Sequence, residues 1–230
     1  MIMTWIKALL DLAYPRFCVV CGQKLSAQEE HICTLCLATL PRTNYHLHLE
    51  NPMEEKFRGK IPLEKTAALY FYQKGNLSCN IIHQLKYKQQ PEIGIFFGKI
   101  YALEILSSGF FNGIDYLMPV PLSTQRYKQR GYNQAEMIAL GISKVTNIPI
   151  APPVIKRIHN NPTQTHKNRI ERVLNTEHLF LAESTETLSY KHILLIDDVV
   201  TTGSTLTACA SSLTNTPGIR FSILTLGYTL

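Results

Sequence analysis

Residues 193–205, Ile-Leu-Leu-Ile-Asp-Asp-Val-Val-Thr-Thr-Gly-Ser-Thr, restrict the fold more than any other part of this chain. They continue a short apolar segment, His192 to Ile196, of the kind that forms a parallel strand covered on both faces. Leucine and alanine residues recur at helical spacing after Gly203. The run therefore predicts a buried strand, then an acidic pair, a loop of small residues and a helix.

The loop has the composition of a phosphate site. It places backbone N–H groups and hydroxyls where a helix begins, and the unsatisfied N–H groups and the helix dipole favour an anion there. Glycine lets the backbone approach that anion closely. The acidic pair can accept hydrogen bonds from adjacent sugar hydroxyls and hold a hydrated Mg²⁺, which prefers oxygen ligands. A plain capped helix is the alternative, but a cap needs one such residue rather than seven within nine positions. The residues concerned are Asp197, Asp198, Thr201, Thr202, Gly203, Ser204 and Thr205.

Basic residues are concentrated just before this motif. The chain has a formal net charge of +6, and the window from Pro119 to Arg172 holds nine basic and two acidic residues, a net charge of +7. This window therefore accounts for all of the excess charge. A polyanionic ligand is the implied partner, with nucleic acid as a serious competitor and a solvated basic face as the alternative without a ligand.

Four of the six cysteines form two C-x₂-C pairs separated by eleven residues. Each pair sits on a tight turn, so four thiolates can converge tetrahedrally on one ion. Such a closed set is typical of structural zinc, whereas a redox dithiol or a small iron–sulfur site is the alternative. This use of cysteine favours a reducing compartment over a disulfide framework. The predicted ligands are Cys18, Cys21, Cys33 and Cys36.

The residues around these pairs favour a scaffolding role for the cysteine module. One lysine and two glutamates lie between the pairs, which makes a poor phosphate binder. His31 is interpreted as a surface residue, because four cysteines already fill the metal shell. Cys79 and Cys209 fall in predicted helices without partners at ligand spacing, and they are interpreted as core or half-buried residues.

A boundary is expected near Pro41, which gives a module of residues 1–42 with an N-terminal helix, followed by a larger domain of residues 43–230. No apolar run reaches the roughly 18 to 20 residues that span a bilayer, so no transmembrane segment is expected. Met1 to Leu12 lacks a basic leader and a cleavage site, and it is interpreted as a docking helix rather than a signal peptide. Its docking surface is either the protein's own core, which we favour, or a membrane machine.

Strands and helices alternate in the larger domain. Strands are predicted at 66–72, 115–120, 192–196 and 220–226. Helices are predicted at 77–88, with Leu77, Ile81, Ile82 and Leu85 on one face, at 93–106, and at 135–145 with a start near Asn133. Weaker strands at 153–158 and 176–181 flank a polar excursion, which predicts a long hairpin or flap. The fold class is therefore α/β, a mostly parallel twisted sheet flanked by helices, with ligands at the carboxyl ends of the strands.

The motif at 197–205 resembles the phosphoribosyl diphosphate (PRPP) motif of type I phosphoribosyltransferases. With the cysteine module in front of it, the whole chain resembles the competence protein F (ComF, also ComFC) family. Further stretches carry the likeness: Ile-His-Gln-Leu-Lys-Tyr at 82–87, Pro-Val-Pro-Leu at 119–122 with Arg-Tyr-Lys-Gln-Arg-Gly-Tyr-Asn-Gln at 126–134, and Asn-Pro-Thr-Gln-Thr at 161–165 with Arg169. Together these stretches cover nearly the whole chain.

The resemblance implies a type I phosphoribosyltransferase fold, a structural Zn²⁺, and Mg²⁺ bound together with PRPP. It also implies a requirement in natural transformation, the movement of incoming single-stranded DNA into the cytoplasm. The acidic pair would contact the ribose hydroxyls, as catalytic residues if the protein is an enzyme, and the loop after it would hold the 5-phosphate. The corresponding positions are Asp197 and Asp198, then Val199, Val200, Thr201, Thr202, Gly203, Ser204 and Thr205.

Two further segments are expected at the same cleft. The turn at the end of the predicted strand 115–120 occupies the place of the family's diphosphate loop; it comprises Pro119, Val120, Pro121 and Leu122. Arg126 and Arg130 share one helical face and can pair with phosphate oxygens, the alternative being a solvent-exposed helix start. The lid candidates, where type I enzymes carry a flexible loop, are Thr163, Gln164, Lys167 and Arg169. For Lys86, a place in this cleft and a surface position are equally open.

Three functions remain compatible with the sequence. The first is a competence-associated, PRPP-binding protein of the cytoplasm that handles single-stranded DNA, with other DNA-uptake proteins at the inner membrane as further partners. Tyr127 and Tyr132 among the cations suit this function, because bases stack on aromatic rings. The second is an enzyme that transfers the phosphoribosyl group to an unidentified nucleobase or other nitrogen acceptor. No residue stands out as its general base, and Gly227-Tyr228 offers at most one ring for a base. A transcriptional regulator is the third, but no helix-turn-helix is apparent.

Overall fold

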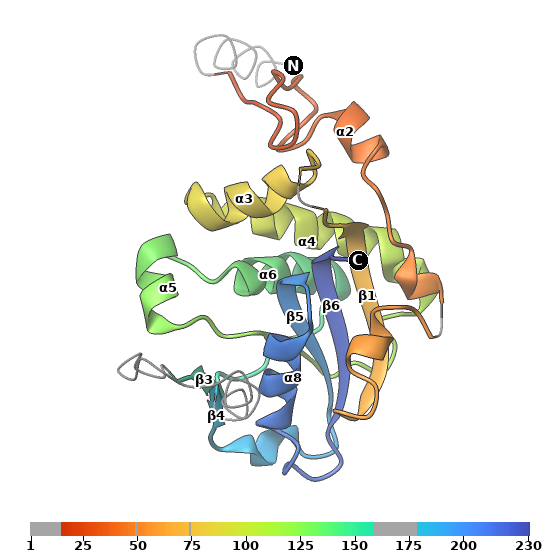
Figure 1. Ribbon diagram of the computed structural model, residues 1–230, viewed down its shortest axis with the longest axis vertical. Helices are drawn as coiled ribbons and strands as arrows, with labels where there is room; N and C mark the ends of the chain where they lie inside the picture. Colours follow the sequence, from red (N-terminus) through yellow and green to blue (C-terminus); the bar gives the residue numbers. More distant parts are fainter. Residues whose placement is uncertain (1–14, 49, 74, 159–178) are drawn as a thin grey trace.

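The computed structural model describes residues 15–48, 50–73, 75–158 and 179–230. Its centre is a sheet of four parallel strands, shown in Figure 1. These are β1 (Leu63–Phe71), β2 (Tyr116–Pro119), β5 (His192–Val200) and β6 (Arg220–Tyr228). Their order is β1-β6-β5-β2, so β5 lies between two neighbours. The predicted α/β class with a parallel sheet is confirmed.

Helices cover both faces of this sheet. One face carries α3 (Cys79–Tyr87), α4 (Pro91–Ile105) and α6 (Gln134–Thr146), and Figure 1 shows α4 and α6 side by side. The other face carries α8 (Ser204–Ser211) and the chain around the short 3₁₀ helix η2 (Glu54–Lys56). The apolar run of β5 serves both cores, since Leu194 and Ile196 join the first cluster and Ile193 and Leu195 the second.

The remaining elements are short. They are α2 (Thr34–Ala38), α5 (Thr124–Arg130), the antiparallel pair β3 (Ile155–Arg157) and β4 (Phe180–Ala182), and the 3₁₀ helices η1 (Tyr45–Leu47), η3 (Leu106–Ser108) and η4 (Thr185–Leu188). The pairing of β3 with β4 agrees with the expected hairpin. The lid candidates Thr163, Gln164, Lys167 and Arg169, and the expected N-terminal helix, lie outside the described residues. Within those residues, every helix is too short or too polar to cross a bilayer.

Two predicted elements differ from the structure. The strand expected at 192–196 continues to Val200, because β6 pairs with it as far as Tyr228. The acidic pair therefore lies within the strand rather than after it. The prediction that Leu77 shares the buried helix face was wrong: α3 begins only at Cys79, and Leu77 precedes it and is 61% exposed. The prediction that Asn133 starts the next helix is confirmed, since its Oδ1 accepts a hydrogen bond from Ala135 N at 3.1 Å.

The cysteine-bearing segment packs against the first core. Cys18, Val20 and Leu40 belong to the same apolar cluster as α3 and α4, and Figure 1 shows this segment at one end of the molecule next to α3. The Asn80 Nδ2 of α3 donates a hydrogen bond to Val20 O at 2.8 Å. His31, interpreted as a surface residue, is half-buried with its ring 5.1 Å from that of Phe96. The expected domain boundary near residue 42 stays a prediction.

Close contact between α4 and α6 requires glycine at position 98. A Cβ atom built there would lie 2.2 Å from the Ile138 backbone oxygen. We expect Gly98→Ala to destabilise the protein by about 2 kcal/mol, because overpacking against backbone outweighs the roughly 1 kcal/mol gained in helix propensity. Chemical denaturation measures this difference. The control Leu103→Ala, at a position of α4 that is 56% exposed, should change the free energy of unfolding by under about 0.5 kcal/mol; equal effects would contradict the argument.

Candidate functional site

The carboxyl ends of the parallel strands open onto a cavity of about 280 Å³. Parallel strands end at one edge of a sheet, so segments far apart in sequence meet there. The cavity is lined by Tyr72, Lys86, Val120, Pro121, Leu122, Arg126, Arg130, Arg157, Asp197, Asp198, Val199, Thr201 and Thr205. The ends of β1, β2, β3 and β5 therefore meet at this cavity, together with residues of α3, α5 and α8.

Most of the residues expected at a phosphate site meet here. A smaller hollow of about 30 Å³ shares Asp197 with the cavity, and it adds Val200, Gly203 and Ser204. Pro119 lines a separate groove, and Thr202 lines neither of the two hollows. The acidic pair, the arginines and the loop before α8 are therefore neighbours in space.

The acidic pair is crowded. Asp198 is 8% exposed, and its backbone N–H donates to Asp197 Oδ1 at 2.8 Å. Burial, followed by the charge of Asp198, raises the pKa of Asp197 to about 7. Two adjacent carboxylates in one cavity form an oxygen donor set of the kind that suits a hydrated Mg²⁺.

The loop after β5 folds around Gly203. This residue has φ +78° and is the N-cap of α8, and a Cβ atom there would lie 2.8 Å from Phe57 Cε1. Within the loop, Thr202 Oγ1 donates to Ser204 Oγ at 3.1 Å. The side chains of Thr201, Thr202 and Ser204 are exposed, so their hydroxyls and the start of α8 face solvent beside the acidic pair.

Four cations surround the two carboxylates. Arg126 and Arg130 line the cavity from α5, which Ser123 caps by accepting a hydrogen bond from Arg126 N at 3.4 Å. Arg130 Nη1 donates to Gln134 Oε1 at 2.6 Å, and its guanidinium lies 5.9 Å from the centre of the Tyr87 ring. Lys86 and Arg157 complete the set. The cavity therefore carries an excess of positive charge, which favours an anionic ligand.

Sequence reasoning left three of these positions undecided or missed them. The sequence left open whether Lys86 lies in the cleft or at the surface. In the structure it lies in the cleft, with its Nζ 3.0 Å from Asp198 Oδ2. Arg157 and Tyr72 were missed, although both lie at the ends of strands and so carried a usable signal. The ring of Tyr228, at most one ring that the sequence offered for a base, is 5% exposed and packs 5.3 Å from the Tyr45 ring, outside the cavity lining. Tyr72 is the aromatic side chain that lines the cavity.

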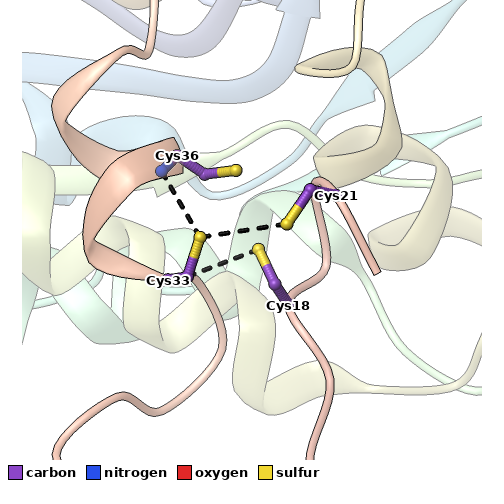
Figure 2. A group of neighbouring side chains, drawn as sticks. All are labelled: Cys18, Cys21, Cys33 and Cys36. Carbon is purple, nitrogen blue, oxygen red and sulfur yellow. Dashed lines mark hydrogen bonds between the residues drawn. The ribbon is translucent and has the colours of Figure 1, made fainter. Parts of the chain in front are cut away.

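The four cysteines form a second candidate site (Figure 2). Their sulfur atoms all lie within 4.8 Å of one another, and Cys21 Sγ is 3.8 Å from Cys33 Sγ. Sulfur atoms bound tetrahedrally at about 2.3 Å from zinc are separated by roughly this distance. Backbone N–H groups support the sulfurs, since Cys33 N donates to Cys18 Sγ at 3.3 Å and Cys36 N to Cys33 Sγ at 3.4 Å.

This donor set fits a metal such as zinc, with a closed shell typical of a structural role. Zinc bound here would link the two turns, which also share a hydrogen bond from Val19 N to His31 O at 2.9 Å and a place in the first core. The remaining two cysteines agree with their interpretation: Cys209 is buried and Cys79 is half-buried, away from the metal candidate.

Removing one sulfur tests the metal centre. We expect the purified protein to contain one equivalent of zinc, and Cys33→Ser to lose it and to lower the melting temperature by roughly 10 °C, because metal binding contributes to folding. Elemental analysis and thermal unfolding measure these effects. The matched control Cys79→Ser, whose side chain can keep the hydrogen bond to Gln73 O, should retain the metal. Zinc retained by Cys33→Ser would contradict the assignment.

The raised pKa of Asp197 gives stability a defined pH dependence. The folded-state pKa of about 7 exceeds that of the unfolded chain, so the stability of the protonated form is present at low pH and lost as pH rises through about 7. Asp197→Asn should therefore raise the melting temperature by roughly 5 °C at about pH 8, and by much less near pH 5.

Asp115 provides a control of opposite sign for this measurement. A hydrogen bond from His192 N lowers the pKa of Asp115, so Asp115→Asn should destabilise the protein at about pH 8. Thermal unfolding of both variants across pH distinguishes the two cases. Stabilisation by Asp197→Asn that is equal at both pH values would show that charge at position 197 is not its cause.

Comparisons with known proteins were made for the whole sequence. No protein-family model matches it. DNA utilization protein YhgH of Escherichia coli is 26% identical over 217 residues, which cover 88% of this chain and 92% of that protein. Competence protein F of Haemophilus influenzae is 28% identical over 199 residues, 83% of this chain and 75% of the relative. Competence protein ComFC of Bacillus subtilis is 28% identical over 204 residues, 88% and 80% of the two chains. Over most of its length, the chain is therefore similar to two competence proteins and a DNA utilization protein.

Proposed function

We propose that this protein takes part in DNA uptake and that its cleft binds a sugar phosphate of the PRPP type together with Mg²⁺. One observation supports this choice of ligand. The acidic pair of β5, the loop before α8 and the arginines of α5 line one cavity and the hollow beside it. The role in DNA uptake is supported by the names of the relatives, two competence proteins and a DNA utilization protein.

Each part of such a ligand has a matching group. Asp197 and Asp198 would accept hydrogen bonds from the ribose hydroxyls, and their oxygens would hold part of the shell of Mg²⁺. The loop at 201–205 would take the 5-phosphate at the start of α8. Arg126 and Arg130 would pair with the diphosphate from the opposite side of the cavity. Mg²⁺, when bound, would neutralise charge on the phosphate oxygens.

The surface next to the cavity is suited to single-stranded DNA. Tyr87 is 64% exposed beside Arg130, and Tyr127 is 51% exposed on the same helix as Arg126. Exposed rings among cations bind a flexible strand by stacking and by phosphate contacts, without a sequence code. DNA bound there would extend over the arginines of the cleft, so the two ligands are expected to compete.

Calorimetric titration of PRPP with Mg²⁺ tests the ligand. We expect Arg126→Gln and Arg130→Gln each to weaken binding about tenfold, because each removes a charge-assisted contact with phosphate. Asp197→Asn/Asp198→Asn should weaken it by about a hundredfold or more. The matched control is Lys128→Gln, which removes an exposed cation of α5 that does not line the cavity, and it should change the affinity by less than about twofold. Equal loss in all variants would indicate general charge rather than a site.

The same proteins then test DNA. A fluorescent single-stranded oligonucleotide, titrated with and without saturating PRPP, should bind more weakly when PRPP is present. Its affinity should also fall steeply with salt. DNA binding that PRPP leaves unchanged would place DNA on another surface, and absence of DNA binding would remove direct DNA contact from the proposal.

A second function, phosphoribosyl transfer, is favoured by one observation. The acidic pair, the loop before α8 and the arginines of α5 line one cavity and the hollow beside it, an arrangement that could hold PRPP and stabilise a departing diphosphate. A nitrogen acceptor would form its bond to C1 of PRPP as the bond from C1 to diphosphate breaks, and its proton would pass to water. Acceptor-dependent release of diphosphate would support this function, whereas PRPP bound without turnover would support a binding role.

A further inference from the structure

The acidic pair already holds a cation from the protein itself. Lys86 Nζ lies 3.0 Å from Asp198 Oδ2, and the two side chains are 23% and 11% exposed. In four further ion pairs, those of Arg42, Lys156, Lys191 and Arg220, the partners are more exposed when taken together. An ion pair that is largely shielded from water is a strong contact, because screening is weak there.

Lys86 is held in place by the helix that carries it. Ile81, Ile82 and Leu85 bury one face of α3 in the first core. Tyr132 Oη donates to Leu85 O at 2.5 Å, one residue before Lys86. The ammonium therefore enters the cavity from a fixed backbone, and its four-carbon side chain allows the charged end to change partner.

The ion pair occupies the oxygen that a ligand needs. A divalent cation bound to the same carboxylate would be repelled by the ammonium, so close contact of both with Asp198 is unfavourable. Removal of the ammonium would leave two neighbouring carboxylates without their closest cation, in a cavity that still carries three arginines. Lys86 therefore weakens the binding of a cation in this cavity and strengthens the binding of an anion.

We propose that Lys86 is the counter-ion of the acidic pair in the ligand-free protein. A divalent cation displaces the Lys86 ammonium from Asp198, and the ammonium then contacts the phosphate of the ligand. This inference rests on the proposed function for its second half, the phosphate contact. The first half concerns the metal alone. Lys86 thereby prevents the acidic pair from binding a divalent cation without the anion, and it makes the binding of metal and sugar phosphate cooperative.

Binding of Mn²⁺ alone tests the first half. Free Mn²⁺ is measured by electron paramagnetic resonance, with zinc-loaded protein and without PRPP. We expect Lys86→Met to raise Mn²⁺ affinity about tenfold, the order expected when one charge-assisted contact is released. Lys88→Met is the matched control, an exposed lysine two residues further along the chain, and it should leave Mn²⁺ binding unchanged. Adding Asp198→Asn to the Lys86→Met variant should abolish the gain in Mn²⁺ affinity.

Binding of PRPP with Mg²⁺, measured on the same proteins, tests the second half. Lys86→Met should weaken PRPP about tenfold, Lys88→Met should not, and Lys86→Arg should keep most of the wild-type behaviour because it keeps the charge. Opposite changes for Mn²⁺ and PRPP in Lys86→Met are the expected signature.

Other outcomes overturn the assignment. If Lys86→Met weakens both ligands, Lys86 has only a structural role in the cleft. If Mn²⁺ affinity does not rise, or if Lys88→Met gives the same rise, no specific counter-ion is displaced. If the wild type fails to bind PRPP while Lys86→Met still gains Mn²⁺ affinity, the proposed function is wrong and the counter-ion assignment stands.

Discussion

The parallel pairing of β5 between β2 and β6 is the constraint on which the rest of the structure depends. Parallel pairing aligns the carboxyl ends of the strands, so β1, β2 and β5 deliver their last residues to one edge of the sheet. Pairing with β6 also extends β5 to Val200, which fixes the backbone of the acidic pair. A loop in that position would leave the direction of both carboxylates undetermined.

Holding two carboxylates together in a cavity is unfavourable unless the surroundings offset their repulsion. In this protein the ammonium of Lys86 beside Asp198 offsets part of the repulsion, and burial raises the pKa of Asp197. Three arginines that line the same cavity keep the cleft positive. The cations that stabilise the acidic pair in the folded protein therefore also suit the binding of a metal ion together with an anion.

Much of the fold follows from local patterns. The apolar run of β5, the cap at Asn133 and the two C-x₂-C pairs each reflect short-range rules of strand burial, capping and metal spacing, and each agrees with the structure. The errors arose where neighbours in space decide the outcome. Leu77 fits the helical period but precedes the helix, because α3 begins only at Cys79.

The sequence by itself determined the alternation of strands and helices, the cysteine set and the acidic pair with its loop, because these depend on residue type and spacing within short segments. The tertiary structure decided which cations reach the acidic pair. Lys86 and Arg157 come from α3 and β3, more than one hundred and about forty residues before Asp198. The strand end at Arg157 indicated only that this residue reaches the same edge of the structure. Which partner each cation meets depends on how distant elements pack together, and no short-range pattern encodes that contact.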